Sequence, residues 1–138
     1  MSSLRLYPPG LPVAYDSAIT VAMPLFKRAP AADAEGYVAT VPVAAVTEDE
    51  MTIIRMAGKK VILTRRAGHV YAIDSVCPHG AADLSEGWLR RGRLCCHEHE
   101  YCFDVATGLL VWPDDEPYRL RRYDVKEEDG VVKVRPAR

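Results

Sequence analysis

Two short segments of the chain each combine one cysteine with one histidine, and this pattern limits most strongly what the sequence can fold into. The first segment is Cys77-Pro78-His79, and the second, beyond residues 80–95, is Cys96-His97-Glu98-His99. Thiolates and imidazoles are the side chains that most often hold zinc and iron in proteins. Both segments are therefore candidates for one shared metal site.

The order of the four side chains favours one kind of metal site. Zinc fingers usually pair two cysteines on one turn with two histidines on a helix, whereas here each segment mixes both types. A two-iron cluster between two loops explains the mixture, because each loop can give its cysteine to one iron and its histidine to the other. The iron bound by neutral imidazoles would then be the one that is reduced. A structural zinc module stays open as an alternative.

Composition excludes several other classes of function. The chain has 138 residues, with 18 Lys and Arg against 19 Asp and Glu, so it has the length of one domain and no charge excess that favours nucleic acid. Residues 11–26 are apolar but are interrupted by Pro12, Asp16 and Pro24 and are too short to span a membrane, and no secretory signal is evident. We therefore expect a cytoplasmic protein that binds neither nucleic acid nor membrane.

Two further cysteines, Cys95 and Cys102, lie beside the second segment. Cysteines of a cytoplasmic protein are more often ligands or buried thiols than disulfides. Neighbouring residues on a strand also point to opposite faces, which separates Cys95 from the candidate ligand Cys96. We expect Cys95 and Cys102 to be buried, inert thiols.

The pattern of apolar residues changes near residue 37. Residues 1–36 are rich in proline and alanine without a helix or strand period, which predicts an extended N-terminal arm. Over 37–138, short β-branched runs alternate with turn residues, which is typical of an all-β domain. Ala57-Gly58, Ala67-Gly68 and Asp129-Gly130 are expected hairpin turns. The expected strands are 38–43, 52–56, 60–65, 70–74, 93–96, 102–105, 118–126 and 131–134, with loops at 77–91 and 97–101.

The two metal-binding segments and their surroundings resemble the Rieske [2Fe–2S] ferredoxins. The resemblance covers about residues 37–136 and implies a β-sandwich-like Rieske domain with two cluster-binding loops at its tip. It is carried by Cys77-Pro78-His79-Gly80-Ala81, Leu84-Ser85-Glu86-Gly87, Cys96-x-x-His99, Phe103-Asp104 and Thr107-Gly108.

The resemblance also assigns the ligands. It implies that one [2Fe–2S] cluster is held by Cys77, His79, Cys96 and His99. His97 is not a ligand, because the family pattern is Cys-x-x-His with an aromatic residue four positions after the histidine, as at residue 103.

Differences from other family members concern the properties of the cluster. Rieske subunits of cytochrome bc complexes tie the two loops by a disulfide, and the matching residues here are Ala82 and Glu98. Those subunits place serine and tyrosine hydroxyls on cluster sulfurs, where this chain has Tyr101 and Phe103. The resemblance therefore implies a reduction potential near the low end of the Rieske range, about −150 mV. Glu100, where many members have glycine or an apolar residue, departs from the pattern of the second loop.

The sequence favours an electron carrier over an enzyme. Four histidines, two of them assigned to the cluster, leave too few for the mononuclear iron site of an oxygenase, and no Gly-x-Gly-x-x-Gly motif is present for a flavin or nicotinamide. Trp112-Pro113-Asp114-Asp115 and residues 120–125 most resemble ferredoxins of diiron toluene monooxygenases. The resemblance implies a one-electron carrier from a flavin-dependent reductase to a terminal oxygenase, either an aromatic-ring dioxygenase or a diiron monooxygenase. The alternative is a tightly bound subunit of a larger oxidoreductase such as assimilatory nitrite reductase, whose partner the arm 1–36 would wrap.

Overall fold

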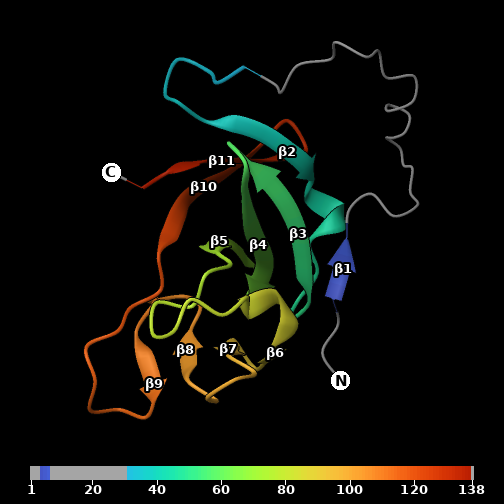
Figure 1. Cartoon of the computed structure of the whole chain (residues 1–138). Helices are drawn as coiled ribbons and strands as arrows, with labels where there is room; N and C mark the ends of the chain where they lie inside the picture. Colours follow the sequence, from blue (N-terminus) through green and yellow to red (C-terminus); the bar gives the residue numbers. More distant parts are fainter. Residues whose placement is uncertain (1–3, 7–30, 138) are drawn as a thin grey trace.

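In the computed structural model the described residues are 4–6 and 31–137, and they form two β-sheets with two short 3₁₀ helices (Figure 1). The all-β prediction is therefore confirmed. No helix in this part of the chain is long and apolar enough to cross a membrane. The helices are η2 (Val43–Ala45) and η3 (Leu84–Glu86).

The larger sheet has seven strands in the order β1-β3-β4-β5-β10-β11-β2, and the smaller has four in the order β6-β7-β8-β9. The larger sheet consists of β1 (Leu4–Leu6), β2 (Val38–Pro42), β3 (Met51–Met56), β4 (Lys59–Arg66), β5 (His69–Asp74), β10 (Arg122–Glu128) and β11 (Val131–Pro136). The smaller consists of β6 (Trp88–Arg90), β7 (Arg93–Cys95), β8 (Cys102–Asp104) and β9 (Leu110–Trp112).

Two-residue turns fix the register of four hairpins. Ala57-Gly58, Ala67-Gly68 and Asp129-Gly130 have positive φ at both residues and connect paired strands, as the sequence predicts. Arg91-Gly92 forms a fourth turn of this kind, between β6 and β7. Turns with positive φ at both central residues match the twist of antiparallel strands, so each holds its two strands in one register.

Three short strands lie outside the predicted ones. Trp88–Arg90 pairs with β7, so the prediction of a loop over 77–91 is wrong at its end. Leu110–Trp112 is the edge strand beside β8. Leu4–Leu6, within the predicted arm, pairs in parallel with β3, whereas residues 7–30 of that arm lie outside the described residues. Three residues are too few to show an alternating pattern, which explains why the sequence does not predict these strands.

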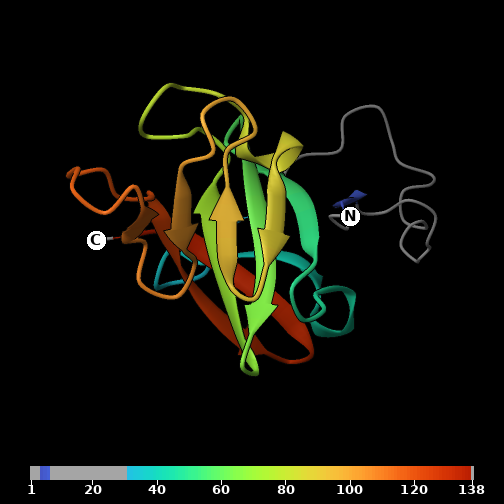
Figure 2. The ribbon, with the colours of Figure 1, turned by 90° about the horizontal axis from the view of Figure 1, so that it is seen from below.

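The central strands of the larger sheet are buried on both faces. On one face, the smaller sheet lies across them (Figure 2), and Ile53 and Ile62 share a core with Leu94 and Phe103. On the other face a second core joins residues of β3, β4 and β5 to residues of β2 and β11. Burial on both faces explains why these strands have continuous apolar runs instead of an alternating pattern.

Cys95 and Cys102 form a disulfide, which corrects the prediction of two inert thiols. The two residues lie directly opposite each other on the antiparallel strands β7 and β8, with their Cα atoms 4.0 Å apart. Residues that face each other across a ladder project to the same side of the sheet. The prediction considered only the neighbours of each cysteine along the chain, and the register that brings the two together is not a local property.

We expect the double substitution Cys95→Ser and Cys102→Ser to lower the free energy of unfolding by about 2.5 kcal/mol, because the bridge restricts the unfolded chain. Urea unfolding of the apo-protein measures the change. Dithiothreitol should lower the wild-type midpoint to that of the variant and leave the variant unchanged. Reaction of all four cysteines with a thiol reagent in the denatured, unreduced protein would contradict the disulfide.

Candidate metal centre

The first ligand loop follows β5 and is closed by its own backbone. The Cys77 N–H donates to the Ala82 carbonyl (2.8 Å), and the Ala81 N–H donates to the Cys77 carbonyl (2.8 Å). Ala81 has a φ of 63°, in the left-handed region. The chain therefore turns back on itself immediately after His79.

The second ligand loop, between β7 and β8, is closed in the same way. The Cys96 N–H donates to the Tyr101 carbonyl (2.8 Å), and the Glu100 N–H donates to the Cys96 carbonyl (2.9 Å). Glu100 has a φ of 58°, matching the residue four positions after the cysteine in the first loop. Glycine adopts this conformation at little cost, whereas other residues adopt it less readily. Glu100 therefore differs from the family pattern in residue type, but its backbone has the same conformation as Ala81 and closes the loop in the same way.

The structure brings the two loops to the same end of the molecule (Figure 2) and places the two cysteines side by side. Cys77 and Cys96 are free thiols with 1% and 0% of their surface exposed. Burial raises the pKa of Cys77, and the neighbouring Cys96 thiol raises it further. A bound metal ion offsets both effects because it stabilises thiolates. Two adjacent buried thiols therefore fit a metal site.

The two histidines also lie together. The rings of His79 and His99 are 4.8 Å apart between centroids, edge to face. His79 Nδ1 is buried and has no hydrogen-bond partner among the described residues. A buried polar atom without a partner is unfavourable, and coordination of a metal ion satisfies an imidazole nitrogen.

Thiol beside thiol and imidazole beside imidazole is the arrangement expected for one Cys₂ iron and one His₂ iron. The described residues contain no group of three or more His, Cys, Asp or Glu side chains that could hold a single metal ion. His97 faces carboxylates instead, with its Nε2 3.9 Å from a carboxylate oxygen of Glu86 and 4.0 Å from one of Glu98.

Tyr101 and Glu116 support His79 through contacts that the sequence does not predict. The Tyr101 ring stacks on the His79 ring at 3.8 Å between centroids, and the Tyr101 hydroxyl donates to the Glu116 carboxylate at 3.0 Å. Partial burial and the Glu116 carboxylate raise the pKa of Tyr101. Tyr118 packs edge-on against both rings. No local sequence pattern indicates these contacts, because they join separate segments of the chain.

Asp83 anchors the end of the first loop. Its carboxylate accepts hydrogen bonds from Lys60 Nζ (2.6 Å) and from the Ser85 N–H (2.9 Å) and hydroxyl (2.7 Å). Burial raises the pKa of Asp83, but the bonds from Lys60 and Ser85 outweigh burial and hold the pKa below its usual value. Asp83 thereby caps η3 and ties the loop to β4.

Gly87 lets the first loop approach the second. A Cβ atom at this position would lie 1.8 Å from the Cys95 carbonyl oxygen, so only glycine fits without a shift of backbone. Cys95 immediately precedes Cys96, and the close approach therefore sets the relative position of the two loops.

Comparisons with known proteins identify the family. The Rieske [2Fe-2S] domain model matches residues 36–127. The ferredoxin component of the naphthalene 1,2-dioxygenase system of Pseudomonas aeruginosa is 34% identical over 101 residues, which are 72% of this chain and 95% of that protein. The ferredoxin component of the alkene monooxygenase system of Xanthobacter autotrophicus is 31% identical over 99 residues, or 71% and 80% of the two chains.

A solved structure agrees with these relatives. The ferredoxin of carbazole 1,9a-dioxygenase from Nocardioides aromaticivorans superposes with a TM-score of 0.63 and 28% identity, over 73% of this chain and 98% of that one. The chain therefore belongs to the Rieske [2Fe–2S] domain family, and a domain of this family carries one [2Fe–2S] cluster. The resemblance and the cofactor inferred from the sequence are confirmed.

We expect Gly87→Ala to prevent cluster incorporation, because the added methyl group would collide with the Cys95 carbonyl beside the second loop. Gly80→Ala is the matched control, since its Cβ would be 3.9 Å from the His99 ring, an ordinary contact. Iron content and visible absorption of the two purified variants measure the effect. Full incorporation by the Gly87 variant would show that the loop approach is not required.

We expect Asp83→Asn to lower the free energy of unfolding of the apo-protein by up to about 1 kcal/mol at neutral pH, because the amide can still cap η3 but no longer forms the ion pair with Lys60. The pKa of Asp83 is lower in the folded than in the unfolded chain, so its contribution is present above the unfolded value and is lost as the pH falls through the folded value. Urea unfolding from about pH 7 to pH 3 should show the difference between wild type and variant shrinking.

Asp114→Asn is the control for this prediction, since Asp114 is exposed and has no ion pair or hydrogen bond within the described part of the chain. A constant difference for the Asp83 variant at all pH values would mean that Asp83 acts through its shape and not through its charge.

Proposed function

We propose that this protein is a Rieske ferredoxin that carries single electrons from a flavin-dependent reductase to a terminal oxygenase in the cytoplasm. The observation that carries this proposal is the side-by-side placement of two buried thiols and of two imidazoles in two loops at one end of the domain. The two curated relatives are named as ferredoxin components of a dioxygenase and of a monooxygenase system, and the match covers 95% and 80% of their lengths. The chain is an electron-transfer component and not itself an enzyme.

Cys77 and Cys96 would hold one iron, and His79 and His99 the other. When bound, the cluster supplies a couple that accepts and releases one electron. The burial of both cysteines keeps water away from the sulfur side of the site. On the imidazole side, Tyr101 covers one face of the His79 ring and limits its rotation.

The two alternatives receive less support. The strand Leu4–Leu6 pairs with β3 of its own chain, so this part of the predicted arm does not favour a subunit that wraps a larger protein. A zinc module does not explain the separate pairing of like side chains. The acceptor would be the terminal oxygenase of a dioxygenase or of a monooxygenase system, the two kinds of system for which the ferredoxin relatives are named.

The direct test is anaerobic purification followed by iron, zinc and sulfide analysis, visible spectroscopy and low-temperature EPR after dithionite reduction. We expect a red-brown protein with two irons and two labile sulfides per chain, and a reduced spectrum of the mixed Cys/His type. A colourless protein with one zinc would overturn the proposal and establish the structural module.

We expect His99→Ala to lose the cluster, whereas His97→Ala keeps it, because the His99 ring lies beside the His79 ring and the His97 ring lies near the carboxylates of Glu86 and Glu98. The two variants are matched in residue type and differ by two positions in one loop. Iron content and the EPR spectrum of the reduced protein distinguish them. Loss of the cluster in the His97 variant with retention in the His99 variant would exchange their roles.

A further inference from the structure

The segment that leads into the first ligand loop is flanked by cationic side chains. At the end of β5 the Asp74 N–H donates to the Arg121 carbonyl (2.9 Å), and one residue further the Ser75 N–H donates to the Lys60 carbonyl (3.1 Å). β4 and the start of β10 therefore border this segment on its two sides. Lys59 and Arg121, at these borders, are both exposed.

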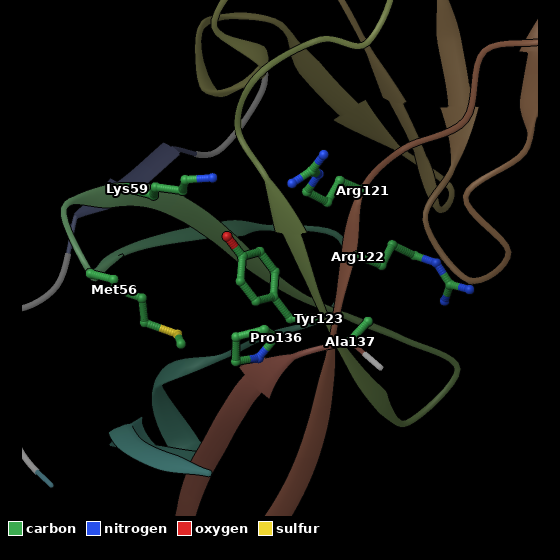
Figure 3. Close-up of a pocket in the computed structure, with 8 residues that line it drawn as sticks. Met56, Lys59, Arg121, Arg122, Tyr123, Pro136 and Ala137 are labelled. Atoms are coloured by element: carbon green, nitrogen blue, oxygen red, sulfur yellow. The ribbon is translucent and has the colours of Figure 1, made fainter. Parts of the chain in front are cut away.

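Two hollows meet between these cations. One, of about 320 Å³, is lined by Met56, Tyr123 and Pro136 together with Lys59 and Arg121. Figure 3 shows the two cationic side chains on one side of the Tyr123 ring and the apolar side chains on the other, with Arg122 pointing away.

The second hollow, of about 340 Å³, shares Lys59 and Arg121 with the first and extends to Val76, Pro78 and Arg119. Pro78 stands between Cys77 and His79, the proposed ligands of the first loop. A molecule bound in these hollows would therefore contact the loop that holds the metal centre. We call the joined hollows the cationic groove.

The positive charge of the cationic groove is only partly offset within the described residues. Lys59, Arg119 and Arg121 form no ion pair there, whereas Lys60, Arg65 and other cations of the same sheet are paired with carboxylates. The carboxylate that faces the groove belongs to Asp74, which is 6% exposed and accepts a hydrogen bond from the Val76 N–H (3.0 Å). Unpaired cations close together repel one another, and a negatively charged partner relieves this repulsion.

The cationic groove also has an apolar component. Val76 is 52% exposed, and Pro78, Met56 and Pro136 line the same surface. Apolar contacts bordered by charged groups are the usual composition of a protein–protein interface. An extended, open surface of this kind fits a segment of polypeptide better than a small enclosed ligand.

We propose that the cationic groove is the docking site for an acidic segment of a redox-partner protein, in which carboxylates flank an apolar side chain. The inference rests on the proposed function and specifies the chemistry of the partner. The second ligand loop and the segment that contacts it are acidic instead, with Glu98, Glu100, Asp114, Asp115 and Glu116. Opposite charges beside the two loops would admit the partner in one orientation.

The test is binding of a fluorescein-labelled peptide with the sequence Asp-Glu-Phe-Glu-Asp to the oxidised protein, followed by fluorescence anisotropy at low ionic strength. The uncharged peptide Asn-Gln-Phe-Gln-Asn is the ligand control. We expect Lys59→Glu combined with Arg121→Glu to weaken binding of the acidic peptide by at least about tenfold, because two attractive contacts become repulsive.

Arg90→Glu combined with Arg93→Glu is the matched protein control. These residues line a separate arginine-rich hollow near the β6–β7 turn, so the variant has the same change of charge away from the cationic groove. We expect it to change peptide binding by less than about twofold, since screened charges at a distance contribute little. Val76→Ser should weaken binding by a smaller factor than the charge reversal.

Three outcomes would overturn the proposal. The first is equal peptide affinity of the wild type and the Lys59/Arg121 variant, and the second is equal or greater loss in the Arg90/Arg93 variant. The third is displacement of the peptide by inorganic phosphate at the same concentration, which would indicate a small-anion site.

Circular dichroism and visible spectra of each variant establish that the fold and the metal centre are unchanged. Peptide binding does not depend on electron transfer, so metal analysis of the same preparations separates failure of the carrier function from failure of the docking site.

Discussion

The backbone hydrogen bonds that close the two ligand loops are the constraint on which the rest of the structure depends. In each loop the cysteine N–H donates to the carbonyl five residues later, and the cysteine carbonyl accepts from the N–H four residues later. The same closure in both loops presents one cysteine and one histidine from each side. A change in either closure would move the cysteine and the histidine of that loop away from the cysteine and the histidine of the other loop, and both like pairs would be lost.

Each loop is connected to the fold by a different kind of bond. The first loop ends at Asp83, which is held by an ion pair to β4, whereas the disulfide Cys95–Cys102 joins the strands on either side of the second. A salt bridge between partly exposed groups contributes modestly and responds to pH and salt, whereas a disulfide responds to the redox state of the surroundings. The two halves of the site therefore depend on separate conditions, although the close approach at Gly87 links their positions.

Local features of the sequence were sufficient to predict much of the fold and the candidate ligands. Ala57-Gly58 and Asp129-Gly130 determine their own turns, and the ligand spacing is contained in two short segments. The disulfide and the contact of Tyr101 with Glu116 were not predictable in this way. Both require knowledge of which strands and segments lie side by side, and three-residue strands such as β6 give no periodic pattern from which to derive it.

The distribution of charge suggests why a small carrier can serve partners without a large interface. A carrier must release each partner after transfer, so extensive apolar burial would slow the cycle by lowering the dissociation rate. Charged side chains at the rim raise the rate of encounter and orient the partner while adding little to the lifetime of the complex. Cations lie beside the first ligand loop and carboxylates lie beside the second. The charges that orient the partner protein are therefore next to the metal centre, and this orientation determines the distance between the two redox centres.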